Sequence, residues 1–324
     1  MYKIINTTDF IDNEKLKGIL EKYSKKYGID YFELIKYSDV DNKPLKDKIK
    51  GYHLRFFPTW LDLYLCNQKE IFSRLIDENT IRGLCGGITK EEMLDYYRKE
   101  LEMAKELEVE YVVLHACNID IFESMTYNFR FSDRQILEKT VEFINEIFNE
   151  EKYSFTLLLE NLWWPGLKLN NYEEVDYLVK NIRYKNIGFM LDTGHMLNTN
   201  LELKNSNEAV KYILENINKL KEYKELIYGV HLNYSLSGEY VKKSIVENNK
   251  KKLSLEEVLK DIYSHINKID YHDPFEDLGV NNIIERLPIR YLVLELIGKT
   301  QEEVEKKIKK QLKFIRQKGI FLRR

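Results

Sequence analysis

The sequence predicts a (β/α)8 barrel, a closed parallel sheet of eight strands surrounded by helices. Short apolar runs alternate with amphipathic stretches along the whole chain, and the runs number eight. Several runs are apolar at nearly every position, as expected for strands covered on both faces. The predicted strands are Tyr2–Asn6, Tyr31–Tyr37, Gly51–Phe57, Tyr111–Ala116, Phe155–Asn161, Ile187–Thr193, Ile227–Asn233 and Tyr291–Ile297.

Helices are expected between these strands because apolar residues recur there at helical spacing. Near the end of the chain, Val304, Ile308, Leu312 and Ile315 share one helical face. A doubly wound open sheet is the alternative fold, and it would need a Gly-rich turn after an early strand. The first strand is instead followed by Thr-Thr-Asp-Phe, which favours the barrel.

Length and composition are consistent with one TIM-barrel domain over residues 1–324, with longer loops at about 58–89 and 234–270. The net charge of −2 provides no overall basic field for nucleic acid. No apolar run is long enough for a membrane span, and the first residues lack the apolar run of a signal peptide. Three scattered cysteines suit a reduced compartment, so a cytoplasmic location is expected.

Histidines at strand ends are the most informative residues. His53, His115 and His231 lie in or at the end of predicted strands, and His195 follows another closely. Each alone would be read as a core or rim residue. In a barrel all strand ends meet at one mouth, so the four imidazoles should face one another there. Imidazoles gathered beside carboxylates point to divalent-metal ligation.

Carboxylates occupy the same level of the predicted barrel. Glu160, Asp192 and Glu295 each end an apolar strand, where an unpaired charge would cost several kcal/mol. A structural salt bridge is the alternative, but none of these three strands carries an adjacent Arg or Lys. Asp192-Thr-Gly-His195 is expected to be a tight turn in which Gly194 permits the bend. Asp270-Tyr-His272 would place two further ligand types on one side of an extended segment.

These segments resemble the xylose isomerase-like TIM barrel superfamily, which includes sugar isomerases, sugar epimerases and endonuclease IV. The resemblance runs from about residue 53 to 295 and is most specific at residues 157–161, 188–195 and 229–233. The epimerases bind one metal through Glu, Asp, His and Glu. The resemblance places these ligands at Glu160, Asp192, His231 and Glu295, and makes His195 a substrate-side residue.

Endonuclease IV implies a larger metal site, because it holds three zinc ions with nine ligands in a fixed order. This chain supplies matching residue types in that order: His53, His115, Glu160, Asp192, His195, His231, Asp270, His272 and Glu295. The cofactor expected is a divalent metal, Zn²⁺ or Mn²⁺, as one to three ions. Glu160, Glu295 and His195 are the expected catalytic residues.

The residues expected to contact substrate match no single branch of the superfamily. The Gly-Ser-Arg segment that follows the strand-seven His in endonuclease IV is absent, as are the Arg of the ketose epimerases and the Lys of xylose isomerase. Side chains beside the ligands are the remaining candidates. They are Asn161, Trp163, Trp164, Asn233, Ser235 and Ser237.

Three functions follow from these observations. The first is metal-assisted phosphoester hydrolysis at a multinuclear site, on a small substrate of phosphate or sugar character. The second is metal-dependent sugar isomerisation or epimerisation, with Glu160 and Glu295 transferring protons. The third is a non-catalytic accessory protein that binds metal. Nucleic acid is not the favoured partner, no membrane partner is expected, and the oligomeric state is left open.

Overall fold

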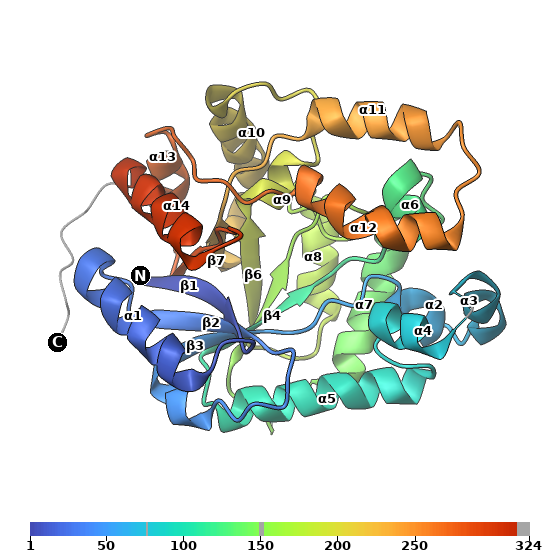
Figure 1. The fold of residues 1–324 in the computed structure, drawn as a ribbon, viewed down its shortest axis with the longest axis horizontal. Helices are drawn as coiled ribbons and strands as arrows, with labels where there is room; N and C mark the ends of the chain where they lie inside the picture. Colours follow the sequence, from blue (N-terminus) through green and yellow to red (C-terminus); the bar gives the residue numbers. More distant parts are fainter. Residues whose placement is uncertain (76, 149–151, 316–324) are drawn as a thin grey trace.

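The computed structural model describes residues 1–75, 77–148 and 152–315, and its centre is a closed parallel barrel (Figure 1). The strands are hydrogen-bonded in chain order, and β1 closes the barrel by pairing with β8. They are β1 (Tyr2–Thr8), β2 (Tyr31–Ile35), β3 (Ile49–His53), β4 (Tyr111–His115), β5 (Thr156–Glu160), β6 (Ile187–Asp192), β7 (Ile227–Leu232) and β8 (Tyr291–Leu294). The predicted fold class and all eight strands are therefore confirmed, with ends that differ by a few residues.

Helices follow the strands and cover the outside of the barrel (Figure 1). The α-helices are α1 (Asn13–Tyr27), α2 (Trp60–Tyr64), α3 (Gln68–Leu75), α4 (Glu78–Cys85), α5 (Lys90–Glu106), α6 (Ile121–Thr126), α7 (Asp133–Ile147), α8 (Tyr172–Asn181), α9 (Thr193–Leu197), α10 (Ser206–Lys219), α11 (Gly238–Asn248), α12 (Leu255–Ile269), α13 (Val280–Glu285) and α14 (Gln301–Phe314). Two short 3-10 helices, η1 (Lys43–Lys48) and η2 (Lys221–Leu226), precede β3 and β7. Thr300 caps α14 by accepting a hydrogen bond from the Glu303 backbone N–H.

The apolar core has two layers because successive strand residues point to opposite faces of the sheet. Ile4, Val113, Leu158, Met190 and Val293 fill the barrel interior and are all fully buried. A larger layer lies between the outer face of the strands and the surrounding helices. The polar side chains at the strand ends therefore lie next to the packed apolar interior of the barrel.

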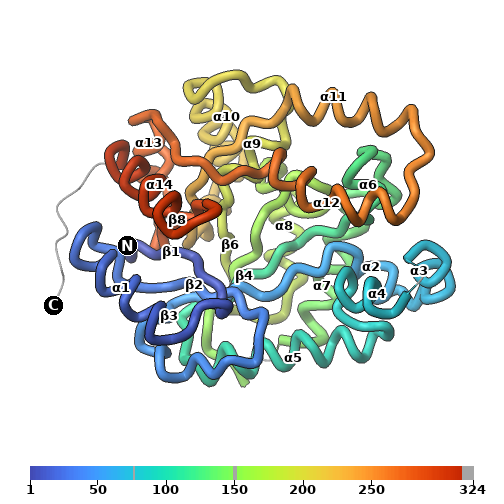
Figure 2. Tube along the Cα trace, in the orientation of Figure 1, coloured from blue at the N-terminus to red at the C-terminus, as the bar shows by residue number. Residues whose placement is uncertain are grey.

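The two long segments predicted as loops are largely helical. The first segment contains α2, α3 and α4, and the segment after β7 contains α11 and α12. Figure 2 follows the second segment through α11 and back along α12, beside α6. Hydrogen bonds from His265 Nε2 on α12 to the Ser124 carbonyl and from Asn248 Nδ2 on α11 to the Met125 carbonyl hold this arrangement. His265 is thus a buried residue that joins α12 to α6.

The helices of residues 60–85 are tied to the loop around α6 by buried acidic residues. Asp62 and Asp120 are almost fully buried, and Arg74 forms ion pairs with both. Arg130 bridges Asp62 and Glu123, at 2.7 and 2.8 Å. Buried carboxylates are tolerated here because each has a guanidinium partner. Within the described ranges, none of the helices has the length and apolar character needed to cross a membrane.

Candidate metal centre

The barrel brings the predicted ligands together at the carboxyl ends of its strands. His115 and Glu160 end β4 and β5, and strand pairing sets them side by side. Asp192 ends β6 and is paired in the same way with His231 of β7. In a parallel barrel the ends of all strands open onto one mouth, so these four side chains converge although they lie far apart in sequence.

His53, His115 and Glu160 form the first of three ligand groups. The Nε2 atoms of His53 and His115 lie 3.0 and 2.8 Å from the same Glu160 atom, Oε2. The other ring nitrogen of His53 contacts the Leu54 carbonyl at 2.9 Å, which fixes the ring so that Nε2 faces the site. Both imidazoles therefore present a nitrogen to one carboxylate oxygen.

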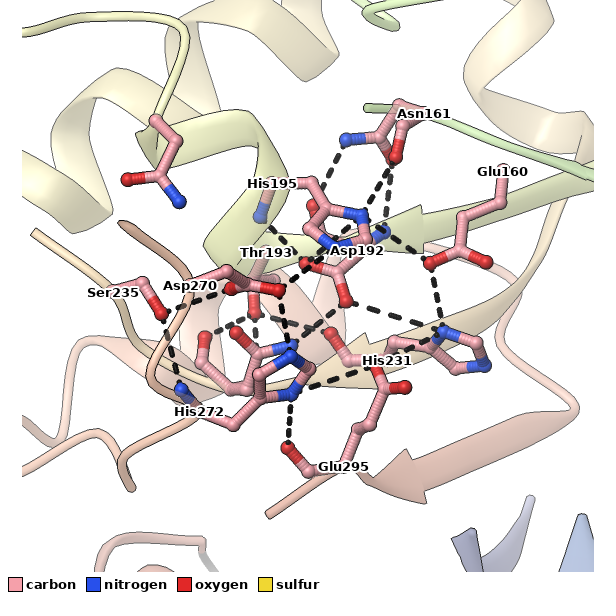
Figure 3. Close-up of polar contacts among 12 residues, drawn as sticks. Glu160, Asn161, Asp192, Thr193, His195, His231, Ser235, Asp270, His272 and Glu295 are labelled. Carbon is pink, nitrogen blue, oxygen red and sulfur yellow. Dashed lines mark hydrogen bonds and ion pairs between the residues drawn. The ribbon is translucent and has the colours of Figure 1, made fainter. Parts of the chain in front are cut away.

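Glu160, Asp192, His231 and Glu295 form the second group, and all four are buried (Figure 3). His231 Nδ1 lies 3.0 Å from Glu160 Oε1 and 3.3 Å from Glu295 Oε2. Its distance to Asp192 Oδ2 is 4.0 Å. Glu160 therefore belongs to both groups and turns a different oxygen toward each.

His195, Asp270 and His272 form the third group (Figure 3). The Nε2 atoms of His195 and His272 lie 3.1 and 2.6 Å from Asp270 Oδ2. His195 Nδ1 is also 3.4 Å from Glu160 Oε1, so this group adjoins the second. The nine side chains thus form one continuous cluster.

Two local expectations about this cluster were wrong. Asp192-Thr-Gly-His195 is the start of helix α9 rather than a tight turn, and the Asp192 side chain caps it by accepting from the His195 N–H at 2.6 Å. Gly194 is needed for space, since a Cβ there would lie 1.8 Å from Asn233 Oδ1. The Asp270–His272 segment is not extended, because His272 has a φ of 47°, in the left-handed region.

Electrostatics show how strongly these groups interact. Burial would raise the pKa of Glu160, but the imidazoles of His115 and His231 hold that pKa well below its usual value. Burial raises the pKa of Asp192 well above its usual value; His195 opposes this rise, and the carboxylates of Glu295 and Glu160 add to it. Carboxylates this close repel one another unless positive charge lies between them.

The donor set fits divalent cations. Five imidazoles and four carboxylates supply nitrogen and oxygen ligands of the kind that zinc and manganese accept. Among the residues that the structure describes, Glu295 Oε2 is buried and has no hydrogen-bond partner, although it lies 3.3 Å from His231 Nδ1. A buried carboxylate oxygen in that state is expensive, and a cation would satisfy it. Cys117 is buried but belongs to none of the three groups.

The polar side chains predicted as substrate contacts form hydrogen bonds with the candidate ligand residues or with Asn198 at the end of α9. Asn161 pairs with the backbone of Asp192 at 2.9 and 3.0 Å, and Asn233 Nδ2 donates to Asp192 Oδ2 at 2.8 Å. Ser235 Oγ donates to Asp270 Oδ1 at 3.1 Å. Ser237 Oγ bonds to Asn198, just after α9. Their side chains orient the candidate ligands, as second-layer residues do in metal sites.

Aromatic rings line one side of the cluster. Trp163 lies 5.1 Å from His195 between ring centroids and contacts Trp164 at 4.5 Å. Both indoles are almost fully buried, which favours packing against the site over an open stacking surface. Phe56 similarly covers His115, at 4.8 Å.

Glu33 is a buried acidic residue at the site that the sequence did not reveal. It lies in β2 with no exposed surface, and its Oε1 is 3.0 Å from His231 Nε2. Its signal in the sequence is an acidic residue inside an otherwise apolar strand, Tyr-Phe-Glu-Leu-Ile. Without the fold, nothing distinguishes a strand residue facing the interior from one facing the helices.

Comparisons with known proteins agree with the barrel fold. Residues 22–318 match the family model described as xylose isomerase-like TIM barrel. A probable endonuclease 4 from Metamycoplasma arthritidis is 24% identical over 158 residues, which is 48% of this chain and 52% of that protein. The alignment therefore spans about half the length of that curated relative.

Solved structures share the fold. Endonuclease IV from Thermus thermophilus superposes with a TM-score of 0.53 at 14% identity, covering 97% of this chain and 98% of the other. The IolI protein, whose structure has a bound zinc atom, gives a TM-score of 0.54 at 18% identity, covering 97% and 96%. At these identities the likeness concerns the fold.

Proposed function

Because the chain belongs to the xylose isomerase-like TIM barrel family, whose known members include enzymes, we propose that it is a metal-dependent phosphoester hydrolase with a multinuclear centre. One observation carries the proposal: nine His, Asp and Glu side chains form three adjoining ligand groups around Glu160. A single-metal enzyme has no need of the first and third groups.

The three groups assign roles to the chain's own residues. Glu160 directs Oε2 toward the first group and Oε1 toward the second, so it would bridge two ions. His195, Asp270 and His272 would hold a third. Divalent ions supply, when bound, the positive charge that activates water and stabilises a phosphate during hydrolysis.

The surrounding residues hold the candidate ligands in place. Asp192 is fixed through Asn161 and Asn233, while Asp270 is fixed by the Ser235 hydroxyl. Preorganised ligands of this kind lower the cost of arranging charge during the reaction. The relatives are an endonuclease and a zinc-containing barrel protein, but a chain with net charge −2 suits a small phosphorylated or sugar-like substrate better than DNA.

Sugar isomerisation or epimerisation is the second candidate, and the second group favours it. Glu160, Asp192, His231 and Glu295 would hold one ion without help from the other two groups. In that reaction Glu160 and Glu295 would transfer protons beside a polarised carbonyl, and His195 would lie on the substrate side. The same four residues serve both candidates, so the remaining five ligand residues discriminate between them.

Metal counting combined with two activity assays tests the proposal. Purified protein loaded with zinc or manganese and freed of excess ion should contain two or three ions per chain by plasma mass spectrometry. It should hydrolyse chromogenic phosphomonoesters or phosphodiesters. One ion per chain together with ketose epimerisation would establish the second candidate instead. A protein that binds ions but catalyses neither reaction would support an accessory role.

A further inference from the structure

Glu33 is a charged residue in the interior of the barrel, beneath the candidate ligands. It occupies the middle of β2 and has no exposed surface. Its carboxylate contacts two groups, the Tyr111 hydroxyl and the His231 imidazole. A buried carboxylate is costly unless its partners are fixed, so these two contacts indicate what Glu33 does.

The contact with His231 uses the ring nitrogen that points away from the site. His231 Nε2 hydrogen-bonds to Glu33 Oε2 at 3.2 Å and lies 3.0 Å from Oε1. The opposite nitrogen, Nδ1, faces Glu160 and Glu295. A proton held on Nε2 by Glu33 leaves the Nδ1 lone pair free to bind a cation.

The structure makes space for a second partner of Glu33. Tyr111 on β4 reaches across β3 and donates its hydroxyl to Glu33 Oε2 at 2.8 Å. Its ring passes over Gly51, where a Cβ would lie only 2.2 Å from Tyr111 Cζ. A residue without a side chain at position 51 is therefore required for the tyrosine to reach the carboxylate.

We propose that Glu33 is a positioning residue that fixes the orientation and tautomer of His231, with Tyr111 holding the Glu33 carboxylate in turn. Glu33 acts through His231 and does not itself contact an ion. This inference rests on the proposed metal-dependent function. It adds a carboxylate–histidine pair to the second ligand group, running from the middle of β2 to the end of β7.

Variants at position 33 test this role through metal affinity. Zinc dissociation constants would be measured by chelator competition for wild type, Glu33→Gln and Glu33→Ala. Loss of a second-layer partner of a metal-bound histidine weakens binding by about 10- to 100-fold, so Glu33→Ala should fall in that range. Glu33→Gln should lie between Glu33→Ala and wild type, because its amide oxygen still accepts from Nε2. Tyr111→Phe leaves the carboxylate in place and should weaken binding less than Glu33→Ala.

A second readout separates positioning from a structural role. Nitrogen NMR of the zinc-loaded protein should show the His231 proton on Nε2 in wild type, and this resonance should shift or broaden in the variants. Circular dichroism melts check that each variant is folded, and Glu33→Gln supplies an isosteric protein if Glu33→Ala does not fold. Wild-type zinc affinity and an unchanged His231 resonance in a folded variant would overturn the inference. A wild-type protein that binds no divalent ion would refute the proposed function as well.

Discussion

Replacing Glu160 by Gln should remove one ion rather than all three, because Glu160 belongs to the first and second ligand groups but not to the third. The first group would be left with His53 and His115 alone, which is too few for tight binding. The second would keep Asp192, His231 and Glu295, and the third would be untouched. The expected metal content therefore falls from three ions to two.

Activity should fall further than metal content. An ion that stabilises charge in the transition state contributes several kcal/mol, and each ~1.4 kcal/mol corresponds to a tenfold change in rate. Loss of the bridging carboxylate should thus lower kcat by at least about 100-fold, with the fold retained. Plasma mass spectrometry of gel-filtered protein and steady-state hydrolysis of a chromogenic phosphodiester measure the two effects.

A matched variant controls for the chemistry of the substitution. Glu110→Gln makes the same change at the opposite end of the barrel, just before β4, where Glu110 accepts a hydrogen bond from Tyr291. This variant should keep three ions and full activity. If Glu160→Gln also retains three ions, or hydrolyses substrate at the wild-type rate, Glu160 is not a bridge. Loss of all ions would show that the third group cannot bind independently.

Three further changes probe different parts of the molecule. Zinc affinity should rise with pH up to about 9. Burial opposes protonation of His272, but the carboxylate of Asp270 outweighs it and raises the pKa of His272 to about 9, so below that pH the ion must displace a proton. Chelator competition at several pH values measures this, and an affinity that does not change with pH would contradict it. The raised pKa also affects the metal-free protein, because protonated His272 stabilises the folded state. This contribution is complete below about pH 6.5 and is lost as the pH rises to about 9. Burial raises the pKa of Glu100 to about 8, so the free energy of unfolding of the wild type should fall by roughly 1.4 kcal/mol per pH unit between about pH 4.5 and 8. Glu100→Gln should remove this dependence of stability on pH. Urea unfolding at several pH values would contradict this if stability changed with pH equally in both proteins. Gly194→Ala should lower the free energy of unfolding by about 1–3 kcal/mol and weaken zinc binding, because the new methyl group would displace Asn233 from Asp192. An unchanged melting temperature would refute this steric argument.

The fold could be predicted from sequence because its elements are marked by strong local patterns. In the strand Thr156–Glu160, three leucines precede one charged terminal residue, so both the strand and its candidate ligand are visible in the sequence. The segment after β7 is helical where a loop was expected, although α12 carries an amphipathic pattern and a Ser254–Glu257 capping box that the sequence displays. The position of both helices against α6 depends on tertiary contacts, which the sequence does not show.

The candidate site could be anticipated only in part, for a related reason. Carboxylates and imidazoles at strand ends indicated a metal site, and the resemblance to endonuclease IV extended the expected ligands to nine. The residues that orient these side chains can be found only from the three-dimensional structure. Asn233 reaches Asp192 only because Gly194 has no side chain, and Glu33 reaches His231 across the barrel interior. Neither relation leaves a local pattern.

The ligand cluster also has a mechanical consequence, because its members come from both halves of the barrel. His53 and His115 belong to the half built from β1 to β4, and Glu160, at the end of β5, belongs to the half built from β5 to β8. Ions held between them would act as cross-links between two chain segments that otherwise meet through strand pairing and packing. Two fragments cut between β4 and β5 should therefore reassemble more tightly in zinc than in chelator, and the candidate metal centre would then also hold the two halves of the barrel together.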